Sequence, residues 1–82
     1  MGWIRLRKKE IKDGIIYYYY QVELNGEWGV LGVNPVTEEC GWEKLASGDT
    51  ADWDVMRCKG YLRILQYAKN NNYPETDMIA CG

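Results

Sequence analysis

The 82-residue chain balances ten Lys and Arg against twelve Asp and Glu, has no His, and combines four Trp and seven Tyr with no Phe. Its length suits one small domain of modest stability, and no apolar run approaches the roughly 20 residues that a membrane-spanning helix needs. Three cysteines without paired spacing, and no His, argue against a disulfide framework or a zinc site and favour a cytoplasmic protein. We therefore expect a single domain over residues 1–82, with a sheet over 3–45, a helix over 50–71 and a tail over 73–82.

The strongest β-strand pattern covers residues 15–24, between the hairpin-turn pairs Asp13-Gly14 and Asn25-Gly26. Its β-branched and aromatic residues favour a strand, and a turn at each end makes it the middle strand of an antiparallel meander. Its even-numbered positions are all apolar or aromatic, whereas its odd-numbered positions become polar toward the end. The even-numbered face is therefore the predicted core face.

Turn chemistry and the apolar pattern together predict how the three strands pair. A three-residue first loop with Gly14 in a left-handed bulge sets Leu6 opposite Tyr20, whereas a two-residue loop there scrambles the two faces. A two-residue second loop sets Tyr20 opposite Leu31. The resulting core face consists of Ile4, Leu6, Tyr18, Tyr20, Val22, Leu24, Leu31 and Val33.

A fourth strand is predicted over residues 40–45, after a turn at residues 35–39. The pairing places Cys40 and Trp42 opposite inward-facing residues of the third strand, so both are expected to point toward the core. The last segment, residues 76–81, is expected to form an edge strand or a docked tail.

The predicted helix over residues 50–71 begins at an N-cap on Asp49 or Thr50 and ends in a run of asparagines. Its polar face is narrow, so its apolar residues point in more than one direction. Such a helix covers the sheet and something else besides, and a homodimer through the excess apolar face is one expected outcome. Gly60 interrupts the helix, which is typical of close packing.

The predicted fold class is α+β: an antiparallel three- to four-stranded β-meander with one long α-helix packed on one face, in the order βββ(β)α, and a short C-terminal tail or edge strand. This order of elements resembles small sheet-reading DNA-binding domains, such as the arm-binding domain of tyrosine recombinases. The likeness covers topology and involves no shared residue motif.

The first candidate site is the sheet face that the predicted core leaves exposed. The predicted pairing sets Arg7 opposite Tyr19 and Lys9 opposite Tyr17, and cations beside rings on an open sheet suit a phosphate backbone and stacked bases. Alternatively, the Lys and Arg stems cover the rings and keep the sheet soluble. The residues of this candidate nucleic-acid surface are Arg5, Arg7, Lys9, Tyr17 and Tyr19.

The second candidate site is acidic and lies in residues 22–54, where eight Asp and Glu accompany a single Lys. Carboxylates beside exposed indoles suit docking onto a basic protein surface, including a groove that normally holds nucleic acid. Alternatively, these acids are ordinary charges of a solvated turn and of a helix N-terminus. The predicted partner-binding surface consists of Glu38, Glu39, Glu43, Asp49, Asp52 and Asp54 with Trp28 and Trp53.

The chain carries no enzyme signature. Ser47 is the only serine and has no His to activate it, and the aspartates are too local for a catalytic pair. Cys40, Cys58 and Cys81 are expected to be small buried hydrophobic residues and not a redox site. We expect no catalytic residue, cofactor or metal.

The expected function is that of a small non-enzymatic protein-binding module, an inhibitor or accessory factor that acts through the acidic and aromatic surface. In style, though in no motif, it resembles small acidic proteins of phages and mobile elements, anti-CRISPR and other anti-defence proteins among them. The pI near 5.0 favours this over the alternative, a nucleic-acid-binding domain, because phosphate contacts dominate nucleic-acid affinity. The expected partner is a protein with a basic groove, and no membrane contact is expected.

Overall fold

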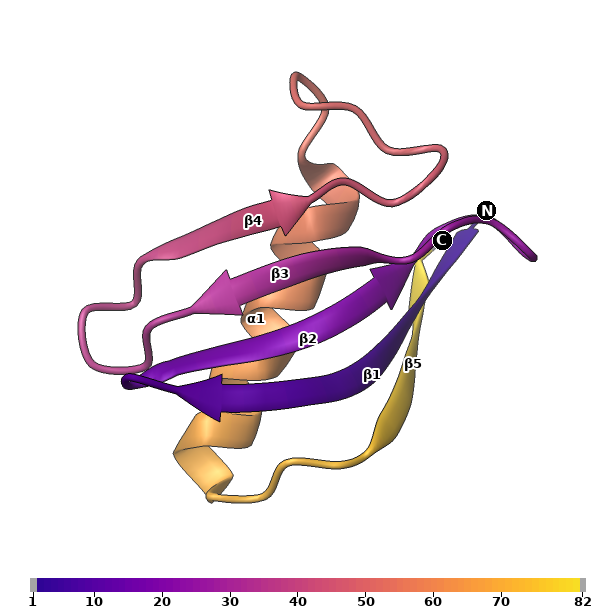
Figure 1. Ribbon diagram of the computed structural model, residues 1–82. Helices are drawn as coiled ribbons and strands as arrows, with labels where there is room; N and C mark the ends of the chain where they lie inside the picture. The colour runs from indigo at the N-terminus through magenta and orange to yellow at the C-terminus, as the bar shows by residue number, and fades with distance from the viewer. Residues whose placement is uncertain (1, 82) are drawn as a thin grey trace.

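The computed structural model describes residues 2–81 of the chain, with the side chains of residues 2–80. Within these residues, five strands form one antiparallel sheet in the order β4-β3-β2-β1-β5, and one helix packs across one of its faces (Figure 1). The elements in chain order are β1 (Gly2–Lys12), β2 (Ile15–Gln21), β3 (Gly29–Val33), β4 (Cys40–Lys44), α1 (Val55–Asn70) and β5 (Thr76–Cys81). The predicted α+β fold is confirmed, and its last segment is an edge strand beside β1.

The first hairpin closes with a two-residue turn and not with the predicted three-residue loop. Asp13 and Gly14 both have positive φ, 54° and 78°, which is the conformation that the favoured two-residue hairpin turn requires. The extra residue is absorbed further along β1, in a bulge at Lys9. Beyond this bulge, Leu6 lies opposite Tyr20 as predicted.

The second hairpin pairs two residues away from the predicted register. Tyr20 lies opposite Gly29 instead of Leu31, and residues 22–28 form a longer connection than the predicted two-residue turn. The position opposite Tyr20 has no room for a side chain, because a Cβ on Gly29 would lie 2.4 Å from the backbone nitrogen of Ala46. A shift of two residues keeps every side chain on its predicted face.

Strand β4 pairs with β3 as predicted, with Cys40 opposite Val33 and Trp42 opposite Leu31. Both residues lie on the helix side of the sheet, but their expected burial is wrong. Helix α1 packs mainly on β3 and β1, and although the Arg57 guanidinium lies 5.8 Å from the centroid of the Trp42 ring, Trp42 stays 44 % exposed.

Two of the three cysteines are exposed, against the expectation that they are buried. Cys40 lies on the edge strand β4, and Cys58 lies on the solvent side of α1. Partial burial raises the pKa of both thiols, so neither has the thiolate character of a reactive cysteine. The side chain of Cys81 lies outside the described residues.

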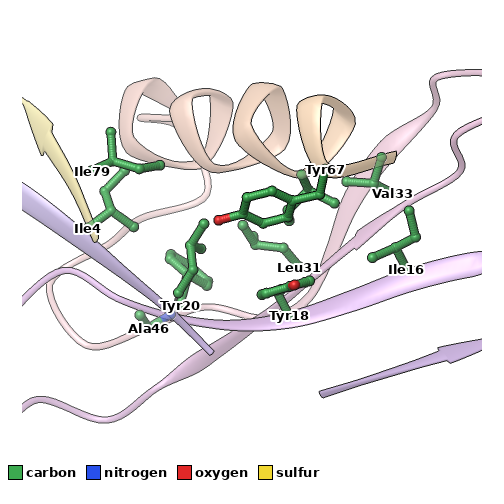
Figure 2. Packing of buried hydrophobic residues seen from close by; sticks show 11 residues of the cluster. Ile4, Ile16, Tyr18, Tyr20, Leu31, Val33, Ala46, Tyr67 and Ile79 are labelled. Carbon is green, nitrogen blue, oxygen red and sulfur yellow. Dashed lines mark hydrogen bonds between the residues drawn. The ribbon is translucent and has the colours of Figure 1, made fainter. Parts of the chain in front are cut away.

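The core fills the layer between α1 and the sheet (Figure 2). The rings of Tyr18 and Tyr67 meet there with their centroids 5.3 Å apart. Two predicted core residues are missing: because β2 ends at Gln21, Val22 is only partly buried and Leu24 is 64 % exposed. The buried cluster consists of Ile4, Leu6, Ile16, Tyr18, Tyr20, Leu31, Val33, Ala46, Ile64, Tyr67 and Ile79.

Helix α1 begins at Val55, later than the predicted start near residue 50. Its N-cap is Asp54, whose side chain makes no capping hydrogen bond. Asp49, a predicted N-cap, is instead paired with Arg57 at 2.9 Å, and the two side chains are 1 % and 3 % exposed. The segment before α1 is therefore held by this buried ion pair and does not form the first turn of the helix.

Only one of the two apolar faces of α1 is buried. Ile64 lies on that face, and so does Gly60, where a Cβ would lie 2.8 Å from Cδ1 of Leu31. The predicted role of Gly60 in close packing is confirmed. The second face leaves Leu62 64 % and Val55 45 % exposed, and a homodimer through it stays a prediction.

A polar cluster ties α1 to β5 around the carboxylate of Asp77. Asp77 accepts hydrogen bonds from Arg63 Nη1 at 2.8 Å, from the Tyr67 hydroxyl and from the backbone N–H of Met78 at 2.8 Å. Burial alone raises the pKa of Asp77, but these three donors outweigh it and hold the pKa below its ordinary value. The charged form of Asp77 is therefore the one that stabilises the fold.

We expect this cluster to make stability depend on pH. Because the pKa of Asp77 is lower in the folded than in the unfolded chain, its contribution is complete above about pH 4 and is lost as the pH falls through the folded pKa. Urea unfolding of the wild type and Asp77→Asn, from about pH 7 to about pH 2, should show a stability difference that shrinks toward acid pH. A constant difference for Asp77→Asn would mean that its charge contributes nothing.

Candidate functional site

No helix covers the sheet face opposite α1 (Figure 1). The side chains of this face come from alternate positions of neighbouring strands. Arg5 and Arg7 of β1 are exposed, and Tyr19 of β2, opposite Arg7, is half-buried. On the other side of β1, Met78 of β5 lies opposite Arg5 and is 60 % exposed. The two arginines therefore lie between an aromatic strand and an edge strand with an exposed apolar side chain.

Arg5 and Arg7 are the cations of this face that remain available. The Arg5 guanidinium lies 5.0 Å from the centroid of the Trp3 ring, a weak contact at an exposed site. Among the described residues, neither arginine takes part in an ion pair. Both guanidinium groups can therefore donate hydrogen bonds to an external anion without first breaking an ion pair with a protein carboxylate.

Lys9 is placed differently from the prediction. The bulge moves it out of the ladder, so Glu10 and not Lys9 lies opposite Tyr17. Its ammonium group is 2.9 Å from Glu10 and about 6 Å from the rings of Tyr17 and Tyr19. The hydrogen bond to Glu10 raises the pKa of Lys9, which keeps it charged but already paired.

Trp28 completes the site. It was predicted to belong to the acidic partner-binding surface, and it does not lie there. Gln21 points to the open face, yet it is only 4 % exposed. The connection over residues 22–28 therefore folds back over this part of the face. The Gln21 amide donates to the backbone oxygen of Gly26 at 2.8 Å. The indole of Trp28 is thereby brought beside Arg7 of β1.

Two hollows adjoin Trp28, and both are lined by Trp28 and Arg7. The first, about 530 Å³, adds Arg5, Thr76 and Met78 to its lining. The second, about 460 Å³, is also lined by Lys8, Tyr19 and Glu75. We refer to Arg5, Arg7, Tyr19, Trp28, Thr76 and Met78 together as the basic–aromatic face.

The predicted acidic surface is divided. Asp49 does not belong to it, because its carboxylate is buried against Arg57. The other acids form two groups along the chain. One group precedes β4 or lies on it, and the other follows β4 and precedes α1 (Figure 1). The exposed acids of the first group are Glu38, Glu39 and Glu43, and those of the second are Asp52 and Asp54, which flank the 63 % exposed Trp53.

No family model, curated protein or solved structure matches this chain. The resemblance in element order to the arm-binding domain of tyrosine recombinases is therefore not accompanied by a structural match. What the chain can bind follows from its own side chains.

Residues 2–81 offer no other obvious chemistry. No helix within them has the length and apolar character needed to cross a membrane. In the same range, no three His, Cys, Asp or Glu side chains are grouped to hold a metal ion.

Proposed function

We propose that this chain is a non-enzymatic binding domain and that its basic–aromatic face binds single-stranded nucleic acid. The observation that carries the proposal is the shared lining of the two hollows: an unpaired arginine, Arg7, beside an indole, Trp28. Single-strand binders combine cations that follow the phosphates with rings on which bases stack.

A single strand fits this face better than a duplex. The side chains of Tyr19 and Trp28 are half-buried at the open sheet face, and stacking on such rings requires unpaired bases. The major groove of a duplex admits a helix or a narrow ribbon, whereas this face belongs to a five-stranded sheet and α1 lies on its opposite side (Figure 1).

The net charge of −2 does not oppose this proposal, because the charge is unevenly distributed. Arg5 and Arg7 lie on the open face of β1, whereas five exposed acids, Glu38, Glu39, Glu43, Asp52 and Asp54, lie on or near β4, which β3 and β2 separate from β1. At physiological salt, exposed charges more than about 8 Å apart are largely screened from each other. Local charge therefore governs contact with phosphate.

Charge reversal at Arg5 and Arg7 tests the proposal. We expect Arg5→Glu with Arg7→Glu to weaken binding of a labelled single-stranded oligonucleotide at least about tenfold, measured by fluorescence anisotropy. Two lost phosphate contacts should also reduce the slope of log affinity against log salt by about 1.4.

The matched control is Glu38→Lys with Glu39→Lys, which changes charge by the same amount at the β3–β4 turn. It should leave binding unchanged or slightly tighter. Unchanged binding by the folded arginine variant, or no binding by the wild type, contradicts the proposal.

A second candidate function rests on Trp53, which is 63 % exposed between two exposed carboxylates, Asp52 and Asp54. Exposed indoles anchor protein interfaces, and rim charges steer association. This arrangement supports a protein-binding inhibitor or accessory factor, of the kind found in phages and mobile elements, with a basic partner. Loss of partner capture in Trp53→Ala, with the arginine variant still active, would favour this candidate.

A further inference from the structure

We infer that Trp28 is a stacking wedge between two successive bases of the bound strand, with Arg7 at the phosphate that joins them. This inference rests on the proposed function and defines its central contact. Trp28 and Arg7 are the two side chains that line both hollows. A ring that borders two neighbouring hollows can offer one stacking surface to each of them.

Each hollow is large enough for a group the size of a small-molecule ligand. Their volumes, about 530 and 460 Å³, fall within the range of roughly 300–1,000 Å³ that small-molecule sites occupy. Tyr19 also lines the second hollow and adds a second ring to it. Met78, 60 % exposed, provides an apolar surface in the other.

The charges in the hollows favour a shared phosphate at Arg7. Arg7 lines both hollows and Arg5 lines the first, so the two unpaired arginines of the open face both border the proposed strand. Asp77 also borders the first hollow, but its carboxylate is already engaged by Arg63 at 2.8 Å. Glu75 is the remaining acid, at the edge of the second hollow.

Trp28 is held in place before any ligand arrives. Its neighbour Glu27 exchanges two hydrogen bonds with Ser47: the Glu27 N–H donates to Ser47 Oγ at 3.1 Å, and the Ser47 N–H donates to Glu27 O at 3.0 Å. On its other side, Gly29 is buried in the sheet opposite Tyr20. Because the backbone on both sides of Trp28 is fixed in this way, this segment needs little ordering when a strand binds.

The substitution Trp28→Leu tests the wedge. We expect it to weaken binding of a single-stranded oligonucleotide about 10- to 100-fold, the effect of losing base stacking on one ring. The dependence of affinity on salt should not change, because the arginines remain. Trp28→Phe, which keeps a ring, should retain most of the affinity, and Trp53→Leu should bind as the wild type does.

A fluorescence readout keeps the test independent of any folding defect in the leucine variant. In a folded variant carrying Trp3→Phe, Trp42→Phe and Trp53→Phe, Trp28 is the only indole, and a stacked base should quench its emission. Wild-type binding that requires the arginines, together with full affinity in Trp28→Leu or no quenching of Trp28, overturns the wedge and leaves the proposed function standing. Absence of any wild-type binding overturns both.

Discussion

The substitution Asp49→Asn is expected to destabilise the domain by about 3–5 kcal/mol, the usual cost of breaking a buried ion pair by removing one partner. In this variant Arg57 keeps its charge but loses its counter-ion. Because its side chain is only 3 % exposed, water cannot replace that counter-ion. Since a whole domain is stable by only about 5–15 kcal/mol, the loss removes a large share of the total.

The cost is high because several groups meet at this carboxylate. Asp49 accepts hydrogen bonds from Arg57 at 2.9 Å, from the Tyr20 hydroxyl and from the backbone N–H of Thr50 at 3.0 Å. Burial of Tyr20 and its hydrogen bond to Asp49 raise the pKa of the phenol, which keeps it a donor. Arg57 also donates to the backbone oxygens of Thr50 and Ala51 at 2.7 and 3.1 Å. One ion pair thus holds the whole segment before α1.

Asp52→Asn provides the matched control, because it makes the same change at an exposed position of the same segment. Equilibrium urea unfolding should place it within about 0.5 kcal/mol of the wild type. Replacing both buried charges, by Asp49→Leu with Arg57→Met, should recover part of the loss, since no unpaired charge remains. Equal stabilities for Asp49→Asn and Asp52→Asn would show that the pair is dispensable.

Alternation of apolar residues predicted the faces of the sheet correctly even where the turns were predicted wrongly. Leu31 pairs with Tyr18 and not with Tyr20, yet all three lie in the core. In the first hairpin, a bulge at Lys9 corrects the register in place of a bulge at Gly14. A pattern of period two determines the parity of the pairing and leaves the position of an extra residue open.

The start of α1 depends on a contact that no local pattern contains. Asp49 followed by an apolar, helix-like segment has the sequence features of an N-cap. Its actual partner, Arg57, lies on α1, and both side chains of the pair are buried. Propensity and periodicity describe neighbours along the chain, whereas this pair forms in the tertiary structure.

The candidate site was also predictable only in part. Arg5, Arg7 and Tyr19 follow from strand alternation and from a pairing that the structure reproduces. The position of Trp28 does not, because it depends on how the connection after β2 folds back over Gln21. Strand periodicity ends where that irregular connection begins.

The substitution Gly29→Ala is expected to destabilise the domain by about 3 kcal/mol or more, at the upper end for overpacking. A Cβ at this position would lie 2.4 Å from the backbone nitrogen of Ala46, 2.4 Å from Cε1 of Tyr20 and 2.5 Å from the backbone oxygen of Lys44. The ring of Tyr20 cannot move away freely, because its hydroxyl oxygen accepts a hydrogen bond from the Ala46 N–H at 3.1 Å. Two of the three obstacles are backbone atoms, which cannot adjust by a change of rotamer.

Gly41→Ala separates this steric effect from the general effect of adding a methyl group to a strand. Gly41 lies in β4 opposite Gly32, and a Cβ there meets nothing within 4 Å, so Gly41→Ala should leave stability unchanged or raise it by about 0.5 kcal/mol. The two variants are compared by chemical unfolding followed by circular dichroism. Adding Tyr20→Ala to Gly29→Ala should bring no recovery, because the contacts with the backbone of Lys44 and Ala46 remain. If Gly29→Ala is as stable as Gly41→Ala, then β3 does not approach the segment after β4 closely, and the two-residue shift of the second hairpin has another cause.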